Sequence, residues 1–267
     1  MRLGNPATGD EFFGRTEELS DLWRYLEADH IRFPGVRRLG KTSILKRLEE
    51  DAAEHGLMAK WLDVSGIDSA QGMVTLLDQA FPEKSISRFV SDRKREVSQW
   101  LSIVRKFEVG VKGVCFEFGG GAAMEWQTAA EKLYERLHNR PLLILLDEFP
   151  VMLEKLVQKD RQEVEQLLAW LRRWRQSHGI CRFVFTGSIG LQSLLERHGL
   201  GETMNDCHSY LLGPYKVSEA RGLWRYFAPM YDEIAWLVDD SVIDYALTAL
   251  AGCRPIFSVC CSMKAFA

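Results

Sequence analysis

The chain has 267 residues and a mass of 30.6 kDa, which suits one large domain or a domain with a small appendage. Apolar residues make up 46% and charged residues 27%, which excludes a disordered tail, a collagen-like fibre and a small disulfide scaffold. The net charge of −3 gives the surface no overall bias toward nucleic acid or anionic membranes. The apolar run 142–146 is far shorter than the roughly 20 residues of a membrane helix. The first residues also lack the apolar core of a secretory signal, so we expect a cytoplasmic protein with no membrane partner.

Helical and strand patterns alternate along the chain, which predicts a parallel sheet with helices packed against it. The first predicted elements are a helix with a stripe from Leu19 to Leu26, a strand over 30–34, a helix over 42–55 and a strand over 57–64. There follow a helix around 70–80, a charged helix over 92–106, a hairpin over 109–118 and a helix over 124–138. The last are a strand over 142–146, a helix over 160–177, a strand over 181–185 and helices beyond residue 213. The expected fold class is therefore α/β.

Residues 35–42 match the phosphate-binding pattern GxxxxGK[ST]. Glycines in this pattern let backbone N–H groups converge on an anion, and the following helix adds its positive end. Lys41 would reach the β- and γ-phosphates of ATP, and the hydroxyl of Thr42 would bind Mg²⁺. The predicted nucleotide-binding residues here are Gly35, Val36, Arg37, Arg38, Leu39, Gly40, Lys41, Thr42 and Ser43. The alternative is a basic turn before a helix; the preceding strand and the amphipathic helix that follows argue against it.

A second motif stands where the apolar strand 142–146 ends in Asp147-Glu148. This is typical of a Walker B strand, in which Asp147 would hold Mg²⁺ and Glu148 would polarise the attacking water as general base. On its own, such a pair of acidic residues is more often exposed to solvent without a function. The two motifs together, however, indicate a P-loop enzyme. The next strand ends in Thr186-Gly187-Ser188, and ligands gather at the carboxyl ends of parallel strands. A hydroxyl of Ser188 or Thr186 would therefore contact the γ-phosphate, with a simple turn as the alternative.

These residues resemble a known group of proteins. The chain is similar, over nearly its whole length, to prokaryotic P-loop ATPases of the AAA+/STAND group, close to the archaeal-type ATPases. The segments that carry the resemblance are 5–6, FFGR (12–15), GVRRLGKTS (35–43), LDVS (62–65), LLILLDEFP (142–150), RFVFTGSIGL (182–191), 204–206, 212–214 and 218–220. FFGR and the two arginines inside the phosphate loop are its most specific pieces.

The resemblance implies an αβα core over 1–213, with a strand order that places Glu148 beside Lys41, and a helical lid over 214–267. It also implies that an N-terminal segment lies near the adenine and that a lid motif closes over the nucleotide. The residues concerned are Phe13, Gly14 and Arg15 for the adenine and Pro255 for the lid. The lid motif is one residue longer than the usual pattern, and the chain ends soon after it, so we expect a shortened lid.

The motifs predict a Mg²⁺-dependent ATPase that couples nucleotide state to conformational change. Turnover would be slow unless a partner supplies charge to the transition state, because phosphoryl transfer depends mainly on positioning and electrostatics. A nucleotide-gated switch or scaffold with little turnover, binding a protein partner or a second copy of itself, is the main alternative. A DNA-acting motor rests on analogy alone, since the sequence has no strong basic stripe.

Other candidate sites are weaker. Arg172, Arg173 and Arg175 with Trp170 and Trp174 could form a nucleic-acid face, but the tryptophans share one helical side, which predicts a core stripe with a solvated basic back. The six cysteines lack the paired spacing of a zinc site and predict reduced thiols. His30 borders a strand and is expected to be structural, and no arginine finger can be assigned.

Overall fold

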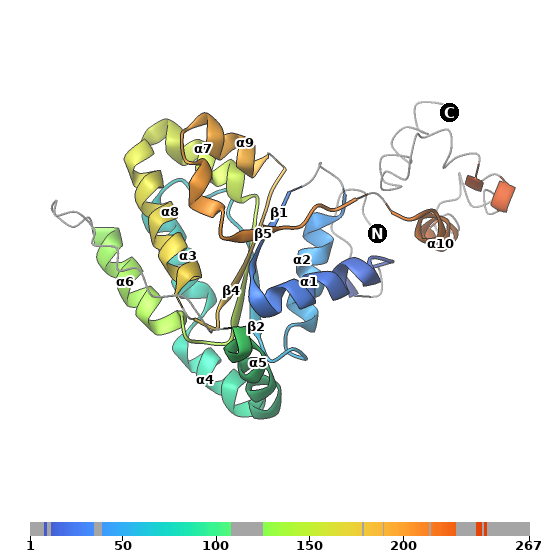
Figure 1. The fold of residues 1–267 in the computed structure, drawn as a ribbon, viewed down its shortest axis with the longest axis horizontal. Coiled ribbons are helices and arrows are strands. Elements are labelled where there is room, and N and C mark those ends of the chain that lie inside the picture. The colour runs from blue at the N-terminus through green and yellow to red at the C-terminus, as the bar shows by residue number, and fades with distance from the viewer. Residues whose placement is uncertain are drawn as a thin grey trace.

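The computed structural model describes residues 8–9, 12–34, 39–107, 125–177, 179–188, 190–213, 215–227, 239–241 and 243–244. Within these ranges, five strands form one all-parallel sheet in the order β2-β3-β4-β1-β5 (Figure 1). The strands are β1 (His30–Phe33), β2 (Met58–Asp63), β3 (Leu142–Asp147), β4 (Arg182–Thr186) and β5 (Cys207–Ser209). The predicted α/β class is confirmed, and β4 lies between the two strands that precede the phosphate and acidic motifs.

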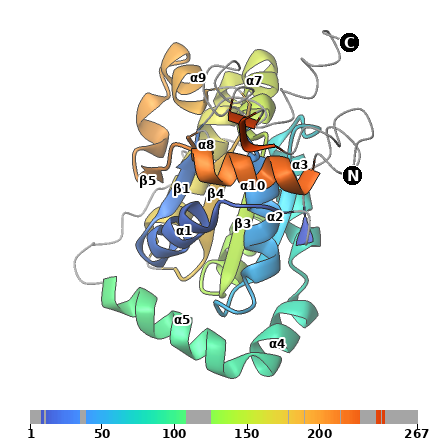
Figure 2. The same cartoon turned by 90° about the vertical axis from the view of Figure 1, so that its right-hand side faces the viewer.

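Helices cover both faces of this sheet (Figures 1 and 2). On one face lie α3 (Ala70–Ala80), α6 (Glu125–Leu137), α7 (Phe149–Lys159), α8 (Arg161–Gln176) and α9 (Leu191–Arg197). On the other lie α1 (Thr16–Ala28), α2 (Lys41–Asp51) and α5 (Lys94–Phe107), with α4 (Glu83–Asp92) joining α3 to α5. A 3₁₀ turn (Gly201–Met204) precedes β5, and α10 (Val217–Phe227) lies on the side of α1 and α2.

The strand β3 belongs to both hydrophobic cores, which explains its unbroken apolar sequence. Leu142, Ile144 and Leu146 pack into the core beneath α3, α6, α7 and α8. Leu143 and Leu145 point the other way, into the core with α1 and α2. All five side chains are fully buried, because a central strand of a parallel sheet has helices on both sides. The prediction for this strand is confirmed.

The predicted long helices are all present, with ends shifted by a few residues. The sequence patterns did not predict α4, α7, α9 or the three-residue β5, which are short or follow directly on other elements. The hairpin predicted over 109–118 lies outside the described residues. Of the lid predicted beyond residue 213, the structure describes α10 and a few residues after it.

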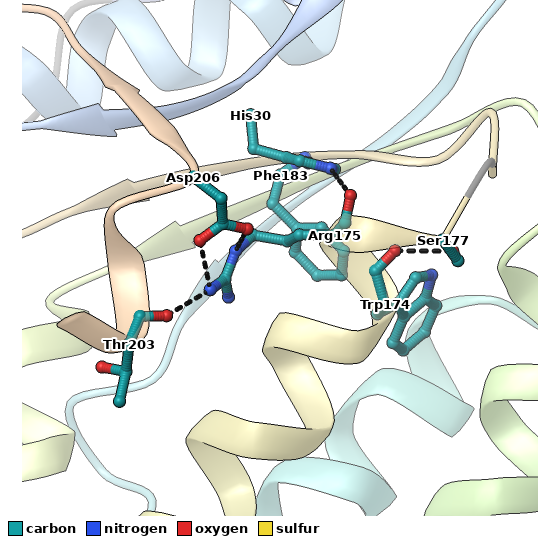
Figure 3. A network of polar contacts seen from close by, with 7 residues as sticks. All are labelled: His30, Trp174, Arg175, Ser177, Phe183, Thr203 and Asp206. Carbon is teal, nitrogen blue, oxygen red and sulfur yellow. Dashed lines mark hydrogen bonds and ion pairs between the residues drawn. The ribbon is translucent and has the colours of Figure 1, made fainter. Parts of the chain in front are cut away.

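The prediction that the arginines of α8 lie on its solvent-exposed side is wrong at one position. Trp170 and Trp174 are buried as expected, but Arg175 is also buried, with 5% of its surface exposed. Its Nε and Nη2 contact the two carboxylate oxygens of Asp206 at 2.9 and 3.0 Å, and Nη2 donates to the carbonyl of Thr203 at 2.6 Å (Figure 3). The periodicity of one helix cannot reveal a partner that a distant segment supplies.

His30 is structural, as predicted. The backbone N–H of Phe183 donates to its Nδ1 at 3.1 Å, so Nε2 carries the proton and donates to the carbonyl of Arg175, also at 3.1 Å (Figure 3). Burial, followed by the charges of Arg182 and Arg175, holds the pKa of His30 well below 6.5. The neutral imidazole therefore joins β1 and β4 to the end of α8.

Candidate functional site

The candidate site lies where α2 begins, at the carboxyl ends of the strands. Gly40 precedes α2 with a φ of +86°, a conformation that favours glycine, and Lys41 begins the helix with 7% of its surface exposed. Leu39, Gly40, Lys41, Thr42 and Ser43 of the predicted phosphate loop are described, whereas 35–38 lie outside the described residues. The described half of the loop therefore ends at a helix N-terminus, where anions bind favourably.

Asp147 joins this helix to β3. Its Oδ2 accepts a hydrogen bond from Oγ1 of Thr42 at 2.7 Å and another from Nε1 of Trp61 at 3.3 Å. Its Oδ1 accepts from the backbone N–H of Glu148 at 3.0 Å. Burial raises the pKa of this carboxyl group, and the bonds from Thr42 and Trp61 oppose that rise. The phosphate-loop and acidic motifs, 105 residues apart in sequence, are thus in direct contact.

Glu148 follows in a left-handed backbone conformation, with a φ of +56° and a ψ of +30°, at the N-cap of α7. A residue other than glycine in this region stores about 1 kcal/mol or more of backbone strain, and such residues cluster at functional sites. Its Oε2 accepts hydrogen bonds from both the backbone N–H (3.0 Å) and the Oγ (2.7 Å) of Ser188. The predicted base and one predicted phosphate contact are therefore bonded to each other.

The end of β4 approaches the start of α7 closely. A Cβ on Gly187 would lie 2.4 Å from Cδ of Pro150, so glycine is required for this contact. The preceding residue, Thr186, is 2% exposed, and its Oγ1 has no hydrogen-bond partner within the described part of the chain. Close by is a cavity of about 120 Å³, lined by Arg32, Phe33, Pro34, Pro150, Phe185, Thr186, Gly187, Leu191, Gln192 and Ser209.

The FFGR segment meets α10. Arg15 is 1% exposed and has a φ of +61°; its guanidinium contacts Glu18 at 2.6 Å and stacks 3.8 Å from the ring centroid of Tyr215. Its backbone N–H donates to Oε1 of Glu219 at 2.8 Å. On the same helix, Gly222 packs against the ring of Phe13. Two segments that carry the family resemblance, 12–15 and 218–220, therefore contact each other; Pro255 lies outside the described residues.

Sequence reasoning missed Trp61. The strands β2 and β3 pair in register, with Asp63 opposite Asp147 and Trp61 opposite Leu145. Side chains alternate along a strand, so Trp61 shares the face of Asp147 and of α2. The alternation in the segment 57–64, combined with this register, is the signal that points to it.

Comparisons with known proteins agree with this architecture. No family profile and no curated protein matches the sequence. Among solved structures, the Walker-type ATPase PABY2304 of Pyrococcus abyssi superposes with a TM-score of 0.58 at 18% identity, over 96% of this chain and 68% of that one. Two Aeropyrum pernix proteins are also similar. ORC1, solved in complex with DNA, has a TM-score of 0.51 at 18% identity over 93% of this chain and 59% of its own. ORC2, in its ADP form, has a TM-score of 0.52 at 17% identity over 93% of this chain and 63% of its own.

The chain has the fold of AAA+ P-loop ATPases. At 17–18% identity the likeness establishes the fold, and the chain spans about three fifths of the length of the two ORC proteins. Among the helices that the structure describes, none has both the length and the apolar composition of a membrane span.

Proposed function

We propose that this chain binds ATP with Mg²⁺ at the start of α2 and hydrolyses it. The observation that carries the proposal is the 2.7 Å hydrogen bond between Thr42 and Asp147. It joins the residue after the phosphate-loop lysine to the acid at the end of a buried strand, which are the two parts that phosphoryl transfer requires. The AAA+ fold supports the same conclusion, since its solved examples include a Walker-type ATPase and an ADP-bound protein.

The residues present fit a magnesium nucleotide. A hydroxyl and a carboxylate are the oxygen ligands that Mg²⁺ prefers, and Thr42 and Asp147 offer both. Lys41 and the N-terminal N–H groups of α2 would bind the phosphates. Thr186 adds a buried hydroxyl without a partner in the described part of the chain, at the edge where the γ-phosphate would lie. Magnesium, when bound, neutralises charge on the triphosphate.

Glu148 is the proposed general base. A base must lie within hydrogen-bond reach of the water that it deprotonates, and here its side chain is fixed by the N–H and Oγ of Ser188. Ser188 would thus connect the γ-phosphate to the base. If the end of β4 moved toward the phosphate, the hydrogen bonds from Ser188 to Glu148 would change. We also propose that α10 is part of a lid and that Arg15, which it contacts, lies near the adenine.

Two variants test the proposal. Lys41→Ala removes the cation for the phosphates and is expected to lose ATP affinity, measured with a fluorescent ATP analogue. Glu148→Gln keeps the shape but removes the base, so it should bind ATP and release phosphate at least 100-fold more slowly, as loss of a general base typically costs about 10²–10⁴. Glu154→Gln on the same helix is the matched control and should hydrolyse normally. Hydrolysis by Glu148→Gln at the wild-type rate would rule out the assigned base.

A nucleotide-gated switch with little turnover is the second candidate. It is favoured by the engagement of Glu148, whose Oε2 already accepts two hydrogen bonds and is less available to a water. In this case the nucleotide would control the contact between α10 and Arg15 and so expose a surface to a protein partner or a second copy. Phosphate-release assays with ATP in excess over the protein separate the two functions: retained ADP without further turnover indicates a switch, and sustained phosphate release indicates an enzyme.

A further inference from the structure

We propose that Trp61 is a positioning residue that orients the carboxylate of Asp147 toward Mg²⁺. The inference rests on the proposed function and extends it to a strand outside both sequence motifs. It stands on the 3.3 Å hydrogen bond from the indole N–H to Oδ2 of Asp147.

The bonding of Asp147 explains why the indole matters. An ionised carboxylate has about four positions at which it accepts hydrogen bonds or a cation. Among the described residues, donors fill three of them: Thr42 and Trp61 on Oδ2, and the N–H of Glu148 on Oδ1. With only these described donors counted, one position, on Oδ1, is left for the cation or a water bound to it. Because Oδ2 is held from two directions, the carboxylate cannot rotate about its bond to Cβ without losing both contacts.

Trp61 is itself held in place. Its strand pairs with β3 in register, which fixes its backbone relative to Asp147. The Nζ of Lys46, on α2, lies 4.6 Å from the centroid of its ring, a cation–π contact. The indole thus lies between α2, which carries Thr42, and β3, which carries Asp147. Among the described residues, two side chains donate hydrogen bonds to Asp147. Thr42 is itself a proposed Mg²⁺ ligand, whereas the indole of Trp61 would act only by orienting the carboxylate.

Three variants separate the hydrogen bond from simple packing. Trp61→Phe removes the donor but keeps an aromatic ring. Trp61→His restores it, because the Nε2 of an imidazole occupies the ring position of the indole Nε1, and at about pH 8 the ring is neutral. Trp126→Phe is the matched control, since the indole N–H of Trp126 is buried without a partner in the described part of the chain.

The measurement is the binding of a fluorescent, non-hydrolysable ATP analogue, titrated with Mg²⁺ and repeated in EDTA. For Trp61→Phe we expect the Mg²⁺ concentration at half-saturation to rise about fivefold, which corresponds to about 1 kcal/mol at 1.4 kcal/mol per factor of ten. Its affinity for the analogue in EDTA should equal that of the wild type. In Trp61→His the Mg²⁺ concentration at half-saturation should return close to the wild-type value. Trp126→Phe should match the wild type with and without Mg²⁺.

An unchanged Mg²⁺ requirement in Trp61→Phe overturns the inference, and so does an equal loss of affinity in EDTA or a failure of Trp61→His to recover. If Trp61→Phe does not fold, Trp61→His decides by itself: half-saturation within about twofold of the wild type supports the inference, and a larger shift overturns it. A wild-type protein that binds no analogue overturns the proposed function, and this inference falls with it.

Discussion

Replacement of Gly187 by alanine tests how the end of β4 controls the site. The added Cβ would lie 2.4 Å from Cδ and 2.8 Å from Cγ of Pro150, whereas carbon atoms in contact are normally about 3.5–4.0 Å apart. The proline ring is rigid, so β4 must move away from α7 by about 1 Å, at an overpacking cost of about 1–3 kcal/mol. Ser188, the next residue, would then lose its 2.7 Å bond to Glu148.

We expect Gly187→Ala to lower the free energy of unfolding by about 1–3 kcal/mol, measured by urea denaturation. It should also slow phosphate release about 100-fold, because a displacement of about 1 Å at a reacting group costs about a factor of 100 in rate. Affinity for ATP should change little, since Lys41 lies on a different element. Gly66→Ala is the matched control, because a Cβ there would meet no atom within 4 Å. If Gly187→Ala is as stable and as active as the control, the argument that the β4–α7 contact positions Glu148 is refuted.

Three further predictions concern the scaffold. Asp206→Ala leaves the buried Arg175 without its ion pair and should lower the free energy of unfolding by about 3 kcal/mol in urea; a loss below about 1 kcal/mol would contradict a role for this pair. His30 has a depressed pKa in the folded state, so its contribution to stability is complete above pH 6.5 and declines as the pH falls below it. The free energy of unfolding of the wild type should therefore fall more between pH 8 and 5 than that of His30→Asn, and parallel profiles would refute this. Glu219→Ala removes the acceptor for the N–H of Arg15, so the amides of α10 should exchange with deuterium about fivefold faster; unchanged exchange would show that this contact does not hold the helix.

The elements with strong patterns could be predicted from the sequence. The run 142–146 is apolar because β3 belongs to two cores, and its position inside the sheet, between β2 and β4, agrees with that composition. Long amphipathic helices such as α8 were predicted within a residue or two. The strand β5 is too short to produce a periodic signal, and α7 follows β3 after a single residue, so neither has a pattern of its own.

Within the site, the sequence predicted candidate residues but not how their side chains are bonded to one another. The contact of Thr42 with Asp147 follows from motifs whose geometry recurs. In contrast, Ser188 was expected to face a phosphate and is bonded to Glu148, and Trp61 carries no motif at all. Arg175 likewise could not be recognised as buried, because its partner Asp206 belongs to a segment that is distant from α8 in the sequence. Side-chain pairs of this kind depend on which strands become neighbours, and one sequence does not encode that order in a local pattern.

The central claim is that the segment ending at Thr42 holds a triphosphate and presents its terminal phosphate to Asp147 and Glu148. A crystal structure with Mg²⁺ and a non-hydrolysable ATP analogue tests it most directly. The account predicts the triphosphate at the N-terminus of α2, with Lys41 on the phosphates and Glu148 facing the terminal one. Nucleotide bound elsewhere on the chain, or a terminal phosphate remote from both carboxylates, would contradict it.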